Sequence, residues 1–328
     1  MYVYDHTLSG PYQRTRDGLG AILGADARQR VRDSDKAPYR WICALDLFFP
    51  RMTEVKGGPP VLTPGNPPPR LDRGTGVLIS PRHVLTAAHN VIPARGIEAL
   101  SITVIPGLDR SKLLKQAPVG SQQISSGQAP VGSLTPAGWW VPPEYKTNRQ
   151  PVWDFALLTL PKDFPVLHGM PYGYWTDAHY APWTKIAAVT ASALVGSPVA
   201  LSGYPADKCK NDACAPCSSL VQADYDSVRG KQSWASTQWE AGGTVQPDPP
   251  PGLILYDADA CTGMSGSPVW QNTTAGDLQL VAIHTGTQTR ANPKTGLNET
   301  FNRGIPLVAQ LLNLLRQRML IDRERARF

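Results

Sequence analysis

The sequence of 328 residues contains no long, uninterrupted apolar run. Its longest uncharged stretch of an apolar kind, residues 186–206, is broken by threonine, serine, glycine and proline, so it predicts paired strands and not a membrane-spanning helix. Residues 1–20 include aspartate and arginine and hold no apolar core, which argues against a secretory signal peptide there. Glycine follows no period, which excludes collagen. We therefore expect no membrane partner.

Charged residues are scarce, at 18% of the chain, and 32 Lys and Arg against 26 Asp and Glu leave a net charge of +6. Arginine is scattered and becomes dense only in residues 316–327. A nucleic-acid-binding domain would instead concentrate basic residues on one face or along one helix. The sequence therefore predicts a mildly basic surface and no nucleic-acid partner.

Cysteine is limited to five residues, of which three lie close together at positions 209, 214 and 217. This C-x4-C-x2-C spacing has no fourth ligand nearby, so it is weak evidence for zinc, and we predict no metal site and no cofactor. Disulfides that pin a loop are the other interpretation, and they would require an exported protein.

Proline and glycine are abundant, with 32 and 29 residues. Both break helices, so a mainly helical protein is disfavoured and an all-β chain with many turns is favoured. Short apolar segments rich in branched or aromatic side chains predict the strands. They cover residues 41–49, 76–80, 102–105, 155–160, 199–201, 253–256, 268–270 and 278–283.

The end of the chain follows a different pattern. After Pro306, leucines at 307, 311, 312, 314 and 315 recur at helical spacing, which predicts a C-terminal helix packed on the body. We divide the chain into an N-terminal extension that could serve as a propeptide, a first β unit, a connector with a second β unit, and the helix. The corresponding ranges are 1–34, 35–165, 166–305 and 306–328.

Three short motifs each lie next to a strand-like run. Thr-Ala-Ala-His ends at His89, Asp154 opens the apolar run 155–160, and Gly-Met-Ser-Gly-Ser-Pro places Ser265 between two glycines. A serine hydroxyl is a weak nucleophile until an imidazole takes its proton, and the imidazole needs a buried carboxylate to fix its tautomer. We therefore predict Ser265 as nucleophile, His89 as general base and Asp154 as its partner. Gly263 lets the backbone turn, so the N–H groups of Gly263 and Ser265 are predicted to form an oxyanion hole.

The order His89, Asp154, Ser265 is that of the chymotrypsin-like fold. The chain resembles chymotrypsin-like serine peptidases, and among them the bacterial glutamyl endopeptidase (V8-like) branch, in the segments GTGVLIS, VLTAAHNV, WDFALLTL, SGYP, YDADACTGMSGSPVW and AIHTG. Asn90, where animal trypsins carry a cysteine, and the G-x-S-G-S-P form of the serine motif point to the bacterial branch. The resemblance implies two six-stranded antiparallel β-barrels, the first with His89 and Asp154 and the second with Ser265. It also implies a serine endopeptidase that acts on protein or peptide substrates.

The resemblance also bears on the residue before the cut bond, P1, and on the S1 pocket that receives it. His284 matches a histidine that binds an acidic P1 side chain in the glutamyl branch, and Thr285 matches a hydroxyl residue that backs the triad aspartate. Ala260 stands where the branch commonly has a threonine. Asp259 stands where trypsins carry the carboxylate that selects Arg or Lys, although some glutamyl endopeptidases have an aspartate there too. We expect Glu or Asp at P1, with Arg or Lys as the alternative.

Activation and location follow from the same resemblance. Members of the family lose a propeptide just before a segment like Ala21-Ile-Leu-Gly24, so a chain that keeps residues 1–20 is a zymogen or does not need this cleavage. Met264 stands where trypsins keep an aspartate for their new N-terminus, so that ion pair cannot form here. The resemblance implies a secreted or periplasmic protein, and the lack of a signal peptide leaves a cytoplasmic protease as the alternative.

Two other functions are alternatives to an unregulated, active peptidase. One is an inactive binding module on the same fold, which would have a collapsed oxyanion geometry around residues 263–265. The other is a protease that cuts one partner under regulation, for which an inhibitor or an activating protein is the expected further partner.

Overall fold

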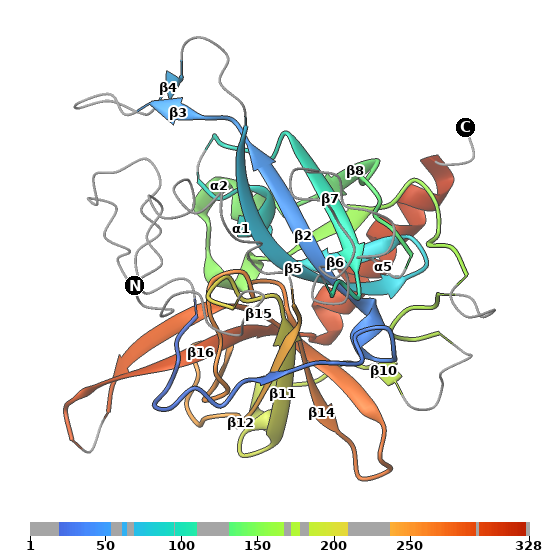
Figure 1. Ribbon diagram of the computed structural model, residues 1–328. Coiled ribbons are helices and arrows are strands. Elements are labelled where there is room, and N and C mark those ends of the chain that lie inside the picture. Colours follow the sequence, from blue (N-terminus) through green and yellow to red (C-terminus); the bar gives the residue numbers. More distant parts are fainter. Residues whose placement is uncertain are drawn as a thin grey trace.

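The structure is a computed structural model, and it describes residues 20–53, 61–63, 69–94, 96–109, 131–166, 172–177, 184–208, 237–292 and 295–325. The strands form two main sheets, one above the other in Figure 1. The N-terminal segment adds a short strand to the lower sheet, and the chain then completes the upper sheet before it forms the rest of the lower one. This mainly β architecture with a C-terminal helix confirms the predicted fold class.

The first sheet is antiparallel and has six strands in the order β7-β2-β5-β6-β9-β8. Its strands are β2 (Ile42–Phe49), β5 (Arg70–Ser80), β6 (His83–Thr86), β7 (Ser101–Pro106), β8 (Gly138–Trp140) and β9 (Ala156–Thr159). A bridge between Val104 in β7 and Leu134, which precedes β8, joins the two ends of the sheet.

The second sheet has eight strands. They are β1 (Gln29–Arg30), β10 (Thr184–Ile186), β11 (Pro198–Gly203), β12 (Trp239–Thr244), β13 (Ile254–Tyr256), β14 (Pro268–Asn272), β15 (Leu278–Ala291) and β16 (Asn298–Pro306). The main path is antiparallel, and a bridge from Val245, just after β12, to Tyr256 in β13 joins β13 back to the β12 side of the sheet. The sheet exceeds the six strands expected because the N-terminal segment adds β1 and the connector adds β10, which pairs in parallel with β15.

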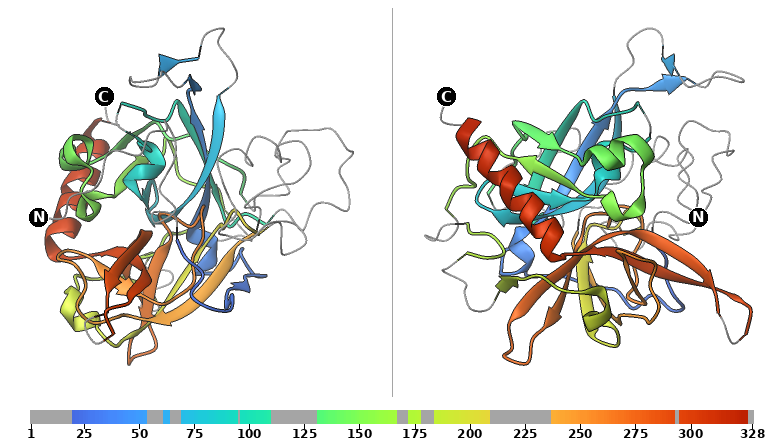
Figure 2. Two further views of the ribbon diagram at one scale, coloured as in Figure 1. Left: turned by 90° about the vertical axis from the view of Figure 1, so that its left-hand side faces the viewer. Right: turned by 180° about the vertical axis from the view of Figure 1, so that it is seen from behind.

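The remaining elements are short, except for the last helix. They are the hairpin β3 (Met52–Thr53) and β4 (Val61–Leu62), the 3-10 turns η2 (Tyr39–Trp41) and η4 (Pro151–Trp153), and the helices α1 (Ala88–Val91), α2 (Pro143–Asn148), α3 (Ala191–Leu194) and α5 (Ala309–Arg325). Helix α5 lies against the first sheet when the molecule is seen from behind (Figure 2), and its Leu311, Leu312 and Leu315 are buried in the same apolar cluster as that sheet. The helix predicted after Pro306 is therefore present. None of the helices in the described ranges is long and apolar enough to cross a lipid bilayer.

Aromatic side chains join the two sheets. The rings of Trp41, before β2, and Trp175, in the connector, lie 6.2 Å apart, and those of Trp175 and Trp270, in β14, lie 5.8 Å apart. Buried aromatic pairs at such distances add to the apolar burial of both halves. This chain of rings fixes the seam between the sheets, where the candidate site lies.

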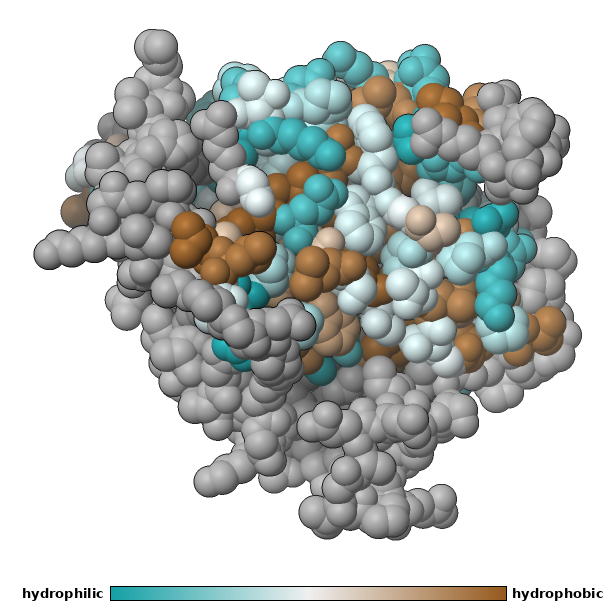
Figure 3. Space-filling view, turned by 90° about the horizontal axis from the view of Figure 1, so that it is seen from above, coloured by the Kyte–Doolittle hydropathy of each residue, from teal (hydrophilic) through white to brown (hydrophobic). Residues whose placement is uncertain are grey.

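The described part of the N-terminal segment is packed on the second sheet. Strand β1 pairs with β12, and the Arg28 guanidinium, which is fully buried, donates to Asp207 and to Asp26 at 2.9 Å each. The chain divisions proposed at residues 34, 165 and 305 stay predictions. Seen from above (Figure 3), apolar and polar side chains of the described residues alternate, and neither kind covers this face.

Candidate active site

Two neighbouring antiparallel strands bring His89 and Asp154 together. His89 lies in α1, just after β6, and Asp154 lies between η4 and β9, which pairs with β6. Asp154 Oδ1 accepts the backbone N–H of His89 at 2.8 Å, and Asp154 Oδ2 lies 2.7 Å from His89 Nδ1. The second contact keeps a proton on Nδ1, so Nε2 is the nitrogen that can take a proton from a nucleophile.

The Asp154 carboxyl is buried against this histidine. Burial alone would raise its pKa, but the charge and hydrogen bonds of His89, with the charge of Arg303, hold the pKa below its ordinary value. Asp154 is therefore ionised at neutral pH, and this is the form that stabilises an imidazolium.

Ser265 lies in a loop whose backbone requires glycine on both sides. Gly263 and Gly266 have φ angles of +93° and +87°. A Cβ on Gly263 would lie 2.4 Å from the Tyr204 carbonyl oxygen, and one on Gly266 would lie 2.1 Å from the Thr75 carbonyl oxygen. The motif noticed in the sequence therefore has a steric cause, because any side chain at either position would push the loop away from its neighbours.

The loop leaves two backbone amides unengaged. Among the described residues, neither the N–H of Gly263 nor that of Ser265 donates a hydrogen bond. The Thr262 carbonyl accepts the N–H of Ala206 at 2.6 Å. Because the N–H of a trans peptide points opposite to its C=O, this bond turns the Gly263 N–H away from Ala206. Both amides of the predicted oxyanion pair therefore lack a hydrogen-bond partner in the described part of the chain.

Ser265 meets the first sheet next to the histidine. Its carbonyl accepts the side-chain amide of Asn90 at 2.8 Å, and Asn90 follows His89 in α1. The Ser265 hydroxyl makes no hydrogen bond within the described part of the chain. Catalytic hydrogen bonds are often long before substrate binds and tighten afterwards. The three predicted residues thus lie at the seam, two contributed by the first sheet and one by the second.

The Asp259 carboxylate is occupied by the N-terminal segment. It accepts the backbone N–H of Leu23 at 2.7 Å and that of Ala27 at 2.8 Å, and Asp259 is 3% exposed. Both oxygens are therefore used to hold backbone amides. A basic P1 side chain would meet a carboxylate whose two oxygens each already accept one backbone amide.

His284 is fully buried in β15, with its Nδ1 2.7 Å from the Tyr256 hydroxyl. Burial, together with the charges of His89 and Arg303, lowers the pKa of His284 to about 3, so the ring is neutral at neutral pH. The Tyr256 hydroxyl also donates to the Arg303 carbonyl at 3.1 Å. Tyr256 was not predicted as a site residue, because it lies 28 residues before His284 and only β13 and β16 bring it there.

Of the two remaining predicted pocket residues, Ala260 contacts the N-terminal segment and Thr285 does not bond to it in the part of the chain that the structure describes. The Ala260 N–H donates to the Ala21 carbonyl at 3.0 Å, and the Thr285 hydroxyl, although buried, makes no hydrogen bond within the described ranges. Asn302, which sequence reasoning missed, pairs with Ala21 in both directions, its Oδ1 accepting at 2.9 Å and its Nδ2 donating at 2.8 Å. No local motif marks Asn302, since its partner is 281 residues away.

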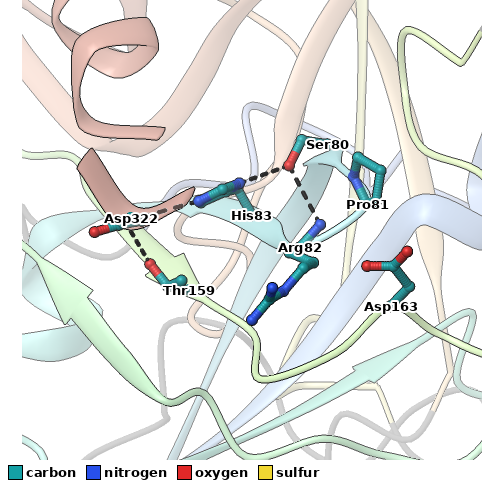
Figure 4. Close-up of a pocket in the computed structure, with 7 residues that line it drawn as sticks. All are labelled: Ser80, Pro81, Arg82, His83, Thr159, Asp163 and Asp322. Atoms are coloured by element: carbon teal, nitrogen blue, oxygen red, sulfur yellow. Dashed lines mark hydrogen bonds and ion pairs between the residues drawn. The ribbon is translucent and has the colours of Figure 1, made fainter. Parts of the chain in front are cut away.

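A second grouping of serine, histidine and aspartate lies beneath α5 and lines a cavity of about 250 Å³ (Figure 4). Ser80 Oγ is 2.7 Å from His83 Nδ1, and His83 Nε2 is 3.7 Å from Asp322 Oδ2. The same Asp322 accepts the Thr159 hydroxyl at 2.7 Å and pairs with Arg318 at 3.0 Å. Ser80 ends β5 and His83 begins β6, on either side of one turn, and neither lies in a glycine-flanked loop, so this grouping fastens the helix.

No group of three or more His, Cys, Asp or Glu side chains within the described ranges is arranged to hold a metal ion. The cysteines at 209, 214 and 217 lie outside those ranges. Cys261 is disulfide-bonded, and Cys43 is buried and free.

Comparison with known proteins agrees with this architecture. A family described as "Trypsin-like peptidase domain" matches residues 74–283, more than half of the chain. The chain is 23% identical over 303 residues to a glutamyl endopeptidase of Bacillus licheniformis, and the matched region covers 90% of this chain and 68% of that protein. It is 21% identical over 283 residues to an extracellular metalloprotease of Bacillus subtilis (86% and 68% covered). A solved structure of a Glu endopeptidase in complex with MPD superimposes with a TM-score of 0.52 at 22% identity, covering 90% of this chain and 98% of that one.

Proposed function

The chain belongs to the family of trypsin-like peptidases and is a serine endopeptidase, and we propose that it cleaves peptide bonds through an acyl-enzyme formed on Ser265. His89 and Asp154 complete the proposed triad. The observation that supports this most is the His89–Asp154 pair, joined by contacts of 2.8 and 2.7 Å beside a serine loop with two unengaged amides.

The proposed chemistry proceeds in two halves. Ser265 Oγ attacks the scissile carbonyl carbon while His89 Nε2 takes the hydroxyl proton, and the N–H groups of Gly263 and Ser265 stabilise the resulting oxyanion. His89 then gives its proton to the leaving amine as the C–N bond breaks, which leaves an ester on Ser265. Water attacks that ester, His89 takes the water proton and returns it to Ser265, and the acid product leaves.

An inactive binding module on the same fold is less well supported. Such a module has no need for free amides in its serine loop, because nothing there develops negative charge. Here the Thr262 carbonyl is held by Ala206, so the Gly263 N–H stays available. An available N–H at this position is what an oxyanion needs, which supports the active peptidase over the inactive module.

We further propose a preference for an acidic P1 side chain. The carboxylate that would select Arg or Lys, that of Asp259, is already bonded to two backbone amides. His284 is neutral, and its ring can donate to a carboxylate from Nε2 in the tautomer in which the Tyr256 hydroxyl gives its one proton to Nδ1 instead of to the Arg303 carbonyl. The printed name of the Bacillus licheniformis relative, glutamyl endopeptidase, supports the same preference.

A peptide library tests both parts of the proposal. We expect the protein to release products that end in Glu or Asp, and we expect Ser265→Ala to release none. Two matched variants accompany it. His284→Gln should lower the ratio of cleavage after Glu to cleavage after Gln by about tenfold or more, because it removes a hydrogen-bonded recognition group. Asp259→Asn should leave the ratio of cleavage after Glu to cleavage after Arg within about threefold, because no recognition group for Glu is lost. Products ending in Arg or Lys that vanish in Asp259→Asn would establish the trypsin-like alternative.

Activation and location remain proposals tied to this function. Cleavage before Ala21 would leave an amine at the place where the Ala21 N–H now donates to Asn302. Cys261 forms a disulfide, and disulfides persist in oxidising compartments, which favours a secreted or periplasmic protein. N-terminal sequencing of the active enzyme, and its location in fractionated cells, would test these two points.

A further inference from the structure

The carbonyl of the proposed nucleophile is held entirely from the first sheet. Ser265 O accepts the backbone N–H of Thr75, in β5, at 2.9 Å, and the side-chain amide of Asn90, in α1, at 2.8 Å. Ser265 itself belongs to the loop between β13 and β14 of the second sheet. Two hydrogen bonds therefore cross the seam to one carbonyl oxygen.

A third bond crosses the seam two residues earlier. The Thr75 hydroxyl donates to the Gly263 carbonyl at 2.8 Å and accepts the Tyr204 N–H at 3.0 Å. The carbonyls of Gly263 and Ser265 lie on either side of the Met264–Ser265 peptide, which carries one of the two oxyanion N–H groups. Holding both carbonyls therefore anchors the backbone on both sides of that N–H.

A second threonine completes the network. The Thr86 hydroxyl donates to the Thr75 carbonyl at 2.6 Å and accepts the Asn90 amide at 3.0 Å. Thr75, Thr86 and Asn90 are all fully buried, where hydrogen bonds are strong and an unmet partner is costly. We call these three residues the serine-loop clamp.

The neighbouring glycine gives the Asn90 side chain its space. A Cβ on Gly74 would lie 2.6 Å from Asn90 Nδ2 and 2.7 Å from its Cγ. Asn90 also follows His89 directly, so one residue contacts the serine segment and continues the histidine segment. The clamp thus sets the position of the serine loop relative to the general base.

We propose that Asn90 and Thr75 are positioning residues for the reaction, a proposal that rests on the function given above. They touch neither substrate nor reacting atoms. They hold the Ser265 loop against α1 and β5, so that the oxyanion amides and the nucleophile keep their direction toward His89. Loss of either side chain should lower the rate of attack on Ser265 more than it lowers substrate binding.

The test is the rate at which a fluorophosphonate labels Ser265, because this reaction needs the nucleophile, the base and the oxyanion hole but no particular P1 residue. The variants are Thr75→Val, which keeps shape and removes the hydroxyl, Thr75→Ser, which keeps the hydroxyl, and Asn90→Ala. The control is Ser267→Ala, since the Ser267 hydroxyl is fully buried in the same loop and makes no hydrogen bond among the described residues.

We expect Thr75→Val and Asn90→Ala to label about 10- to 100-fold more slowly than wild type, somewhat less than the loss of an oxyanion donor itself. Thr75→Ser and Ser267→Ala should stay within about threefold, because neither loses a hydrogen bond of the clamp. On a peptide that wild type cleaves, kcat per titrated site should fall in the two deficient variants with KM nearly unchanged. Near-ultraviolet circular dichroism at the assay temperature establishes that each variant is folded.

Folded Thr75→Val and Asn90→Ala proteins that label at the wild-type rate would overturn the proposal. If Thr75→Val does not fold, Asn90→Ala decides, because the Thr75 N–H still holds the Ser265 carbonyl in that variant. A wild-type protein that is folded but not labelled at all would instead overturn the proposed function, so the two failures are distinguishable.

Discussion

Among the residues that the structure describes, serine, histidine and aspartate come together at two places, which differ in how the carboxylate and the serine are held. In the first, Asp154 bonds both the ring and the backbone N–H of His89, and Ser265 comes from the other sheet in a loop with free amides. In the second, Ser80 and His83 share one turn, and Asp322 lies 3.7 Å from the imidazole. The comparison teaches that backbone donors and a carboxylate dedicated to the histidine, more than the three side chains, make a candidate peptidase site.

The largest expected effect separates the two serines. Ser265→Ala should lower kcat by roughly a million-fold, because the nucleophile is lost and only binding and oxyanion stabilisation remain. Ser80→Ala should leave kcat/KM within about twofold, as expected for a residue distant from the chemistry. Hydrolysis of a peptide ester by the purified variants is the measurement. Comparable losses in both would show that the comparison is wrong.

The next effect concerns the two aspartates. Asp154→Asn keeps the shape of the site but can no longer fix the His89 tautomer, so kcat should fall by about 10⁴-fold. Asp322→Asn is the matched change at the other grouping and should leave kcat unchanged. Full activity of Asp154→Asn at neutral pH would contradict the assigned role of the carboxylate.

Stability should show the opposite ranking. Asp322→Ala removes the acceptor of the Thr159 hydroxyl and the partner of Arg318, which should lower the free energy of unfolding by about 1–3 kcal/mol through unmet buried polar groups. Urea unfolding followed by fluorescence measures this change, with Ser80→Ala as the milder companion. An unchanged urea midpoint for Asp322→Ala would mean that the contacts of Asp322 do not hold α5 against the first sheet.

The third buried histidine gives the smallest effect and extends the comparison to pH. His284 bonds a tyrosine and no carboxylate, and burial lowers its pKa to about 3. The unfolded chain therefore binds a proton at its ordinary pKa, near 6.5, that the folded protein does not, and stability is lost as pH falls from about 6.5 toward 3, by at most about 1.4 kcal/mol per pH unit. His284→Gln should flatten this slope between pH 7 and 5. Equal slopes in both proteins would place the titrating group elsewhere.

Much of the fold could be predicted from the sequence, and the predicted strand 41–49 matches β2. The candidate triad could be proposed because each member lies in a local motif beside a strand. His89 contacts Asp154, and the Ser265 carbonyl accepts the side chain of Asn90 next to His89, while the catalytic assignment stays a prediction. Strand β1 could not be predicted, since two polar residues carry no periodic pattern and pair with β12 only in the folded chain.

Pocket residues depend on long-range contacts that no local pattern reveals. Asp259 has the residue type and position of a basic-P1 selector, yet its carboxylate holds the backbone of Leu23 and Ala27, more than 200 residues earlier. Asn302 and Tyr256 owe their places to β16 and β13 in the same way. The clamp residue Asn90 stood out only as a departure from animal trypsins, without a partner to explain it.

The most direct test of the central claim is the site of covalent labelling. Wild-type protein is incubated with a fluorophosphonate, digested and mapped by mass spectrometry, with Ser265→Ala and Ser80→Ala treated in parallel. We predict one adduct, on the peptide that contains Ser265, present in Ser80→Ala and absent from Ser265→Ala. An adduct on Ser80, or no adduct on a folded wild-type protein, would contradict the assignment of Ser265, His89 and Asp154 as the catalytic residues.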